Sequence, residues 1–281
     1  MTTTSGPQAR LDPDRAALSQ HLREVAVDAA LLVADDLRKA FRGTIDVEYK
    51  RDEHDPVTAH DRAAEDAIAA ALIGAVPDSG FVGEEDGDRP GRAGEVTWYV
   101  DPIDGTANFA HGLAFFCTSI GAAVDGQIVA GAILDPMAGN LFSADLSGAW
   151  RNDEPLRSRG VTAEARAMLL TSYPNARGLA DDGAAALTRF GELVGSYGTL
   201  RRPGSAALSL CHVAAGWADA ALGTSINGWD ICAAQLIVTQ AGGRYVGFGG
   251  TGWNQPHYAA HTADLEPVVL ERFIAEHQGA A

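Results

Sequence analysis

Apolar residues recur every three or four positions over residues 14–41, which is the spacing of one face of an α-helix. A second helix is expected from Thr58 to Ala75, since Thr58 is followed three residues later by Asp61 in a capping-box-like pattern. The turn residues of 77–80 end that helix. Between the two helices, residues 45–49 predict a short strand. The first part of the chain is therefore expected to be mainly helical.

Short apolar runs replace the helical spacing further along the chain. Residues 81–85 and 96–100 predict strands. Turn residues such as Asp125-Gly126 and Asp135-Pro136 then separate further runs, as is typical of an antiparallel meander. The strands expected in this meander span residues 116–124, 127–134, 139–144 and 148–151.

Strand and helix patterns alternate again beyond Arg157. The expected strands span 168–172, 198–202, 217–222 and 244–248, and the expected helices span 183–194, 205–215, 231–241 and 266–276. We find no internal repeat and no low-complexity linker, so two packed α+β layers that share helices are expected rather than two tethered domains. The expected division is a disordered tail (1–13), an N-terminal α+β half with the antiparallel sheet (14–155) and a C-terminal α/β half (156–281).

Composition narrows the class of protein. The net charge is −16 and the sequence contains no run of Lys or Arg, which argues against a nucleic-acid partner held in basic grooves. No apolar run approaches the ~20 residues of a membrane span, and the polar N-terminus lacks the apolar region of a signal peptide. The three cysteines lie in apolar segments without Cys-x-x-Cys spacing, which indicates reduced core residues. A soluble cytoplasmic protein is expected.

The segment Trp98–Phe109 carries the strongest chemical signal. A buried strand is followed directly by Asp101 and Asp104, with Pro102 between them and Gly105-Thr106 after them. Carboxylates are the oxygen ligands that Mg²⁺ prefers. Gly105 lets the backbone approach an anion closely, and a helix beginning near Thr106 directs free N–H groups toward it. A cation bound beside a phosphate fits this arrangement, which indicates a phosphoryl-transfer or phosphatase site.

Three further acidic positions have both a structural and a functional interpretation. Asp61 is suited to stabilising the start of its helix, and Asp230 to acting as the N-cap of the helix 231–241. Glu84-Glu85 lies in a glycine-flanked loop and is also compatible with a solvated turn. These residues alone do not decide between the two interpretations.

Four motifs in order resemble the inositol monophosphatase superfamily of Mg²⁺-dependent, lithium-sensitive phosphatases. They are Asp55-Pro-Val-Thr-Ala-His-Asp61, Gly83-Glu-Glu85, Asp101-Pro-Ile-Asp-Gly-Thr106 and Trp229-Asp230, continuing into Gln240-Ala-Gly-Gly243. Order and spacing agree over roughly residues 15–275. The resemblance implies an α/β/α/β/α sandwich of the type shared with fructose-1,6-bisphosphatase, a homodimer, and two or three Mg²⁺ ions per site.

The resemblance also implies roles for individual residues. Glu84, Asp101 and the carbonyl of Ile103 would hold a first metal, and Asp101, Asp104 and Asp230 a second. Thr106 with Asp61, together with Glu84, would activate water, and the N–H groups of Gly105 and Thr106 would hold phosphate. Glu85 and Lys50 would support the metal site, and Ser205, Ala206 and Asn227 would contact the substrate. The implied reaction is a metal-assisted in-line displacement by water, with no covalent enzyme intermediate.

Position 223 leaves the substrate open. Inositol phosphatases of this family typically have a glutamate seven residues before the motif aspartate, whereas this chain has Gly223. Ser225 and Asn227 are the nearest polar residues. The candidates are inositol monophosphate or another sugar or polyol phosphate, fructose 1,6-bisphosphate and histidinol phosphate. A catalytically silent regulatory binding protein is the alternative of another class, but its signature would be a broken metal set, and every metal residue is present.

Overall fold

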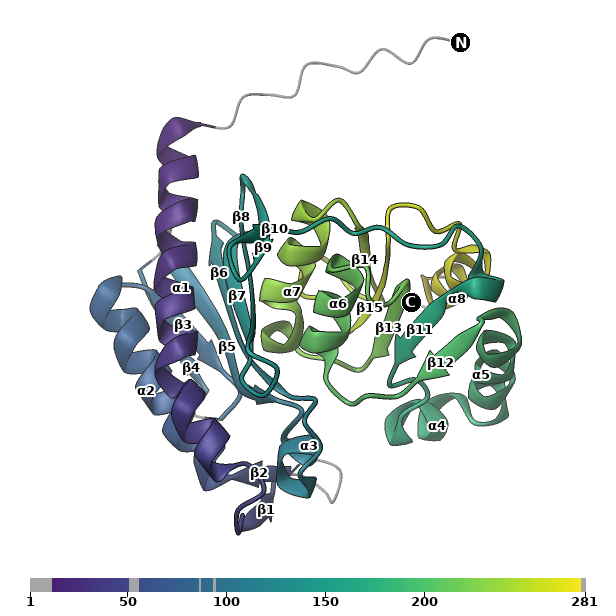
Figure 1. Cartoon of the computed structure of the whole chain (residues 1–281), viewed down its shortest axis with the longest axis horizontal. Coiled ribbons are helices and arrows are strands. Elements are labelled where there is room, and N and C mark those ends of the chain that lie inside the picture. The colour runs from purple at the N-terminus through teal and green to yellow at the C-terminus, as the bar shows by residue number, and fades with distance from the viewer. Residues whose placement is uncertain (1–11, 51–55, 86, 93–94, 279–281) are drawn as a thin grey trace.

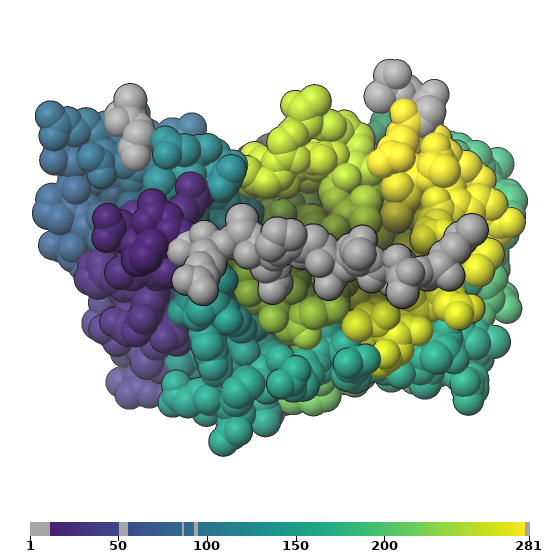
Figure 2. Space-filling model, turned by 90° about the horizontal axis from the view of Figure 1, so that it is seen from above, coloured from purple at the N-terminus to yellow at the C-terminus, as the bar shows by residue number. Residues whose placement is uncertain are grey.

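Helices and sheets alternate in five layers across the long axis of the molecule (Figure 1). The computed structural model of the chain describes residues 12–50, 56–85, 87–92 and 95–278. In order, the layers are a helix pair, an eight-stranded sheet, a second helix pair, a five-stranded sheet and a group of outer helices. The α+β class and the layered sandwich expected from the sequence are confirmed. Figure 2 shows the N-terminal helices and the C-terminal residues at opposite ends of the long axis.

The first layer consists of α1 (Pro13–Ala40) and α2 (Ala59–Ala75). α1 begins with Asp12 as the N-cap and Pro13 in the first turn, so the helix reaches into the expected tail, whose residues 1–11 lie outside the described part of the chain. Its apolar stripe, which includes Leu22, Val33 and Leu37, is buried against the first sheet. α2 begins with the predicted capping box of Thr58 and Asp61.

The eight-stranded sheet has the order β10-β9-β8-β7-β6-β5-β3-β4, antiparallel except for the parallel pair β3–β5. The strands are β3 (Gly80–Gly83), β4 (Asp88–Arg89), β5 (Val96–Asp104), β6 (Cys117–Val124), β7 (Gln127–Asp135), β8 (Asn140–Asp145), β9 (Gly148–Arg151) and β10 (Glu154–Pro155). The predicted meander is confirmed. β5 continues four residues past the predicted end at Val100, because Asp101 and Asp104 still pair with β6. β1 (Val47–Tyr49) and β2 (Pro56–Thr58) form a separate antiparallel pair, and α3 (Thr106–His111) follows β5.

The central layer consists of α6 (Ala206–Ala214) and α7 (Gly228–Gln240). α7 lies very close to the first sheet. A Cβ at Gly121 of β6 would lie 2.4 Å from Cys232 Sγ, and one at Gly131 of β7 would lie 2.7 Å from Ala233 Cα. Glycine at these positions therefore permits the close packing that sets where the start of α7 lies relative to the end of β5.

The second sheet has the order β12-β11-β13-β15-β14 and is mixed. Its strands are β11 (Met168–Thr171), β12 (Thr199–Arg201), β13 (Ala220–Thr224), β14 (Arg244–Phe248) and β15 (His257–His261). The first three are parallel to one another, and β15 is antiparallel to both of its neighbours. The outer helices are α4 (Ala176–Asp182), α5 (Ala184–Ser196) and α8 (Val268–Gln278), and η1 (Glu164–Arg166) precedes β11. None of the described helices has the length and apolar character needed to cross a membrane.

The differences from the sequence prediction concern short elements, one strand and one helix start. β2, β4, β10, β15, η1 and α4 were not predicted, and β13 begins at Ala220, three residues later than the strand predicted at 217–222. α7 begins three residues earlier than predicted, with Asn227 as the N-cap. Asp230 is therefore the third residue of the helix, and its interpretation as the N-cap is wrong.

Candidate active site

A bulge at the end of β5 places two aspartates on the same side of the sheet. Asp101 pairs with Ser119 and Asp104 with Cys117, so β5 has one more residue than β6 between these two pairs. In a regular strand, residues an odd number apart face opposite sides, and the extra residue cancels this alternation. The bulge is held by Ile103 N, which donates to Asp101 Oδ1 (3.0 Å), and by Thr118 Oγ1, which donates to the Pro102 carbonyl (2.9 Å).

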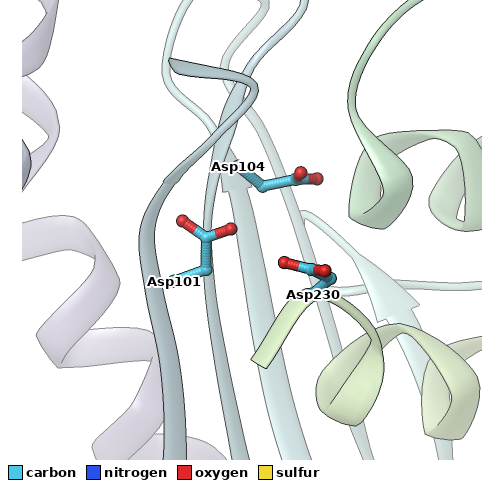
Figure 3. A group of neighbouring side chains, drawn as sticks. All are labelled: Asp101, Asp104 and Asp230. Carbon is cyan, nitrogen blue, oxygen red and sulfur yellow. The ribbon is translucent and has the colours of Figure 1, made fainter. Parts of the chain in front are cut away.

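Asp230, in the first turn of α7, completes a group of three carboxylates with Asp101 and Asp104 (Figure 3). One oxygen of each residue lies within 4.8 Å of the others. Among the described residues this is the one such group of potential metal ligands, and it joins a strand end of the first sheet to a helix start of the central layer. We call it the aspartate cluster.

Burial and mutual repulsion make the ionised form of this cluster unfavourable. Burial raises the pKa of Asp101 well above its usual range, and the charges of Glu84, Asp104 and Asp230 raise it further. Burial likewise raises the pKa of Asp230, with repulsion from Asp104 next in importance. The pKa of Asp104 is raised by burial to about 6, although hydrogen bonds oppose that shift. A cation would relieve both the desolvation and the repulsion.

The start of α6 holds Asp104 in place. Ser205 Oγ donates to Asp104 Oδ2 (2.5 Å), Ala207 N donates to the same oxygen (2.7 Å), and Ala206 N donates to Oδ1 (3.3 Å). Ser205 and Ala206, predicted as substrate contacts, thus lie beside the cluster with their polar groups on Asp104. Asn227, predicted for the same role, is exposed, and its N–H donates to Asp230 Oδ2 (2.7 Å).

Asp61 and Thr106 meet across 45 residues of sequence. Asp61 Oδ2 accepts from Thr58 N (2.8 Å) and from Thr58 Oγ1 (2.6 Å), while Thr106 Oγ1 lies 3.1 Å from Asp61 Oδ1. The Thr106 hydroxyl also lies 3.0 Å from the Ile103 carbonyl, and its single proton serves one of these two acceptors at a time. Burial raises the pKa of Asp61. Asp61 therefore caps α2 and contacts Thr106 at once, so the two interpretations left open by the sequence both hold.

Gly105 supplies the backbone conformation that the turn into α3 requires. Its φ of 99° lies in the left-handed region, where a side chain is disfavoured. A Cβ there would also lie 3.1 Å from the Phe115 carbonyl and 3.3 Å from the Gly204 carbonyl. A side chain at this position would therefore disturb both the turn and its contact with the loop that precedes α6.

Glu84 and Glu85 form an ion-pair network with Lys50. Lys50 Nζ lies 3.0 Å from Glu84 Oε1 and 2.6 Å from Glu85 Oε1, and the Glu85 side chain is 3% exposed. The interpretation of this pair as a solvated turn is wrong, since both carboxylates are engaged and Glu85 is buried. Burial raises the pKa of Glu85 to about 7. Glu84 lies close enough to raise the pKa of Asp101, but it is not among the three oxygens of the aspartate cluster.

Glu65 is a residue of this region that the sequence analysis missed. It is fully buried on α2, and its Oε2 accepts from Glu85 N (3.0 Å). A Cβ at Gly83 would lie 2.5 Å from the Glu65 carboxyl carbon, so glycine is required where the loop passes Glu65. The sequence does contain a signal, because Glu65 lies four residues after Asp61 and three before Ile68, on the face of α2 that is buried.

A small cavity borders the loop that precedes the cluster residue Asp230. Its volume is about 220 Å³. It is lined by Val82, Tyr99, Ile226, Asn227, Gly228, Trp229, Asn254 and Pro256. The three cysteines, predicted to be reduced core residues, are all free and buried, and Cys117 Sγ lies 3.8 Å from Asp104 Oδ2.

Comparison with known proteins identifies the family. The model of the inositol monophosphatase family matches residues 18–279. The chain is 38% identical over 205 residues to the Nus factor SuhB of Pseudomonas aeruginosa, covering 72% of this chain and 76% of that protein. It is 36% identical over 224 residues to the inositol-1-monophosphatase of Mesorhizobium japonicum, covering 79% and 84% respectively.

A solved structure agrees with these sequence matches. The crystal structure of the extragenic suppressor protein SuhB from Bartonella henselae superposes with a TM-score of 0.80 at 31% identity, covering 89% of this chain and 96% of that one. The chain therefore belongs to the inositol monophosphatase family, and it is a phosphoric monoester hydrolase.

Proposed function

We propose that the chain is a Mg²⁺-dependent phosphatase that hydrolyses a small sugar or polyol phosphate monoester by attack of water. The observation that carries this proposal is the aspartate cluster, in which one oxygen each of Asp101, Asp104 and Asp230 lies within 4.8 Å of the others. Thr106, whose hydroxyl is hydrogen-bonded to Asp61, lies two residues after Asp104. Acidic ligands for a cation thus stand beside a group able to orient water.

The cluster fits a hard divalent cation. Its ligands are carboxylate oxygens, and burial and repulsion raise the pKa of all three aspartates, so a positive charge is needed to keep them ionised near neutral pH. Glu84, Asp101 and the Ile103 carbonyl would hold one Mg²⁺, and Asp101, Asp104 and Asp230 another, with Asp101 shared. When bound, the metal supplies a more acidic water and neutralises charge on the leaving oxygen.

The remaining residues act on water and phosphate. Asp61 accepts a hydrogen bond from the Thr106 hydroxyl. The lone pairs of the Thr106 oxygen are then free to accept a hydrogen bond from the attacking water. We assign phosphate binding to the N–H groups of Gly105 and Thr106 at the turn into α3, which has no side chain at position 105 to obstruct the approach. Lys50, held between Glu84 and Glu85, offsets negative charge at the edge of the site. No covalent enzyme intermediate is needed.

The substrate proposal is broader than inositol monophosphate. The relative from Mesorhizobium japonicum bears the name inositol-1-monophosphatase, which supports a polyol phosphate. Gly223 lacks the carboxylate that would bind polyol hydroxyls, so fructose 1,6-bisphosphate and histidinol phosphate stay in the substrate panel. Family membership supports a cytoplasmic homodimer that is inhibited by lithium. The Pseudomonas aeruginosa relative bears the name Nus factor, which keeps a regulatory role by protein contact as the second candidate.

Phosphate release from a panel of monoesters, measured with Mg²⁺ and with EDTA, tests the proposal. We expect Mg²⁺-dependent release from at least one sugar or polyol phosphate. Asp101→Asn is expected to abolish turnover with the circular dichroism spectrum and melting temperature retained. The matched control is Asp135→Asn, a buried aspartate at the end of β7 that accepts from Met137 N and Ala138 N (both 2.9 Å) outside the cluster. Absence of release from every ester would favour the regulatory protein, and an active Asp101→Asn variant would refute the metal assignment.

A further inference from the structure

The space above Gly223 is filled by another side chain. Gly223 on β13 pairs with Tyr258 on the antiparallel strand β15, so side chains at these two positions share one face of the sheet. A Cβ at Gly223 would lie 2.3 Å from Tyr258 Cε1 and 2.8 Å from Tyr258 Cζ. Cζ carries the hydroxyl, so the polar end of the Tyr258 ring occupies the position from which a side chain at residue 223 would extend.

The Tyr258 hydroxyl has no hydrogen-bond partner among the described residues. The residue as a whole is 2% exposed, but its hydroxyl is not among the unpartnered side-chain atoms that are fully buried, whereas those of Tyr173 and Tyr245 are. A hydroxyl group of a largely buried residue normally has a hydrogen-bond partner. A ligand oxygen that reaches this hydroxyl would supply one.

The phenol lies close to the aspartate cluster, and its orientation is held by a neighbouring ring. Beyond the effect of burial, the charges of Tyr245, Asp104 and Asp230 raise the pKa of Tyr258 above its usual range. Tyr245 of β14 stacks on Tyr258, with ring centroids 6.0 Å apart and planes 14° apart. The Tyr258 ring is thus packed between its contact with Gly223 of β13 and the stacked Tyr245 ring.

We infer that Tyr258 is a specificity-determining residue whose hydroxyl hydrogen-bonds the alcohol portion of the substrate. It would take the role that a polar side chain at position 223 could otherwise have. This inference rests on the proposed phosphatase function. A carboxylate only accepts hydrogen bonds and repels anions, whereas a phenol both donates and accepts and carries no charge. The substrate class that fits is a phosphate monoester with at least one hydroxyl group on its alcohol portion.

The first test compares substrates with and without such a hydroxyl group. The hydroxylated probes are inositol 1-phosphate, fructose 1,6-bisphosphate and glycerol 2-phosphate. Histidinol phosphate, whose alcohol portion carries an amine and an imidazole, and 4-nitrophenyl phosphate have no hydroxyl group there. For Tyr258→Phe we expect kcat/KM on the best hydroxylated substrate to fall about tenfold relative to 4-nitrophenyl phosphate, mainly through KM, since one neutral hydrogen bond is lost. An unchanged ratio would overturn the inference.

Tyr245→Phe is the matched control. It removes the buried, unpaired hydroxyl of the stacked partner, whose pKa is raised by burial and Cys232 and not by Asp104 or Asp230. The substrate ratio of this variant should equal that of the wild type. If the wild type releases phosphate from none of the five esters, the proposed function fails, which is distinct from failure of the inference about Tyr258.

A second pair of variants tests the shared space. Gly223→Glu alone should lower the melting temperature, because its Cβ meets the Tyr258 ring. Combining Gly223→Glu with Tyr258→Val should restore the melting temperature and raise the preference for inositol 1-phosphate over 4-nitrophenyl phosphate. If Gly223→Glu alone is as stable as the wild type with the same substrate ratio, Tyr258 does not occupy this space and the inference is wrong.

Discussion

The helices α2 and α7 begin at the site with the same local arrangement but face different partners. In each, the third helical residue is an aspartate that accepts from the N-cap backbone N–H, at 2.8 Å for Asp61 and Thr58 and at 2.7 Å for Asp230 and Asn227. The Asp61 carboxylate also accepts from the side chains of Thr58 and Thr106. Asp230 instead faces Asp101 and Asp104.

This difference shows that an aspartate that caps a helix can still contact other groups through its carboxylate. The residues around that carboxylate then determine whether it accepts hydrogen bonds from hydroxyl groups or faces other carboxylates. The pKa of Asp61 is raised by burial, while hydrogen bonds from Thr58 and Thr106 oppose the shift. The pKa of Asp230 is raised by burial and then by repulsion from Asp104 and Glu84. A carboxylate that accepts from hydroxyl groups is suited to proton transfer, and a carboxylate beside other carboxylates is suited to binding a cation.

Asparagine substitutions at the two positions give the largest expected contrast. Asp61→Asn should lower kcat by about 10²–10⁴-fold, the range for loss of general-base assistance, with little change in the Mg²⁺ concentration for half-maximal rate. Asp230→Asn should instead raise that Mg²⁺ concentration by about tenfold or more, since a carboxylate ligand is lost. Initial rates measured against Mg²⁺ concentration separate the two effects. The comparison fails if both variants show the same dependence on Mg²⁺.

Thermal stability measured with and without Mg²⁺ tests whether the aspartate cluster that contains Asp230 binds the cation. Burial raises the pKa of Asp104 to about 6 in the folded chain, from the ordinary value of 3.8 for an aspartate. Its contribution to stability is therefore present below the unfolded pKa and is lost as the pH rises through about 6. Mg²⁺ binds the ionised form, so it should raise the melting temperature more at about pH 8 than at about pH 5. Asp101→Asn should abolish this difference, and an equal Mg²⁺ effect at both pH values would count against the cluster as the metal site.

Alanine at the two N-caps gives the smallest effect. Thr58→Ala and Asn227→Ala should each lower the free energy of unfolding by about 1 kcal/mol, as loss of an N-cap does. Thr58→Ala also removes the hydrogen bond from the Thr58 hydroxyl that lowers the pKa of Asp61. The pKa of Asp61 should therefore rise, and the acidic limb of the kcat/KM profile should move to higher pH. Asn227→Ala should leave that limb in place. Denaturant unfolding measures the change in stability, and pH–rate profiles measure the position of the acidic limb. If the acidic limbs of the two variants coincide, Thr58 does not lower the pKa of Asp61.

Elements with strong local patterns were predictable, and those defined by distant pairing were not. α1, α2 and the meander of β6–β9 follow from apolar spacing, a capping box and turn residues. β15 was missed because His257–His261 has no β-branched residue, and its place between β13 and β14 depends on strands that are distant in sequence. The start of α7 was placed too late, because the capping pattern of Asn227 and Asp230 was not recognised.

Three features could be predicted from the amino-acid sequence alone: the acidic motif after β5, the capping box of α2 and, from the order of the motifs, the family. These features depend on residues near one another in the chain, where local geometry leaves few alternatives. The resemblance also implied that Asp230 lies with Asp101 and Asp104, and the folded chain brings the three together. Two contacts could be seen only in the folded chain: Ser205 holds Asp104, and Tyr258 fills the space above Gly223. These contacts join residues far apart in the chain, and the packing of α7 on Gly121 and Gly131 and the pairing of β13 with β15 bring them together.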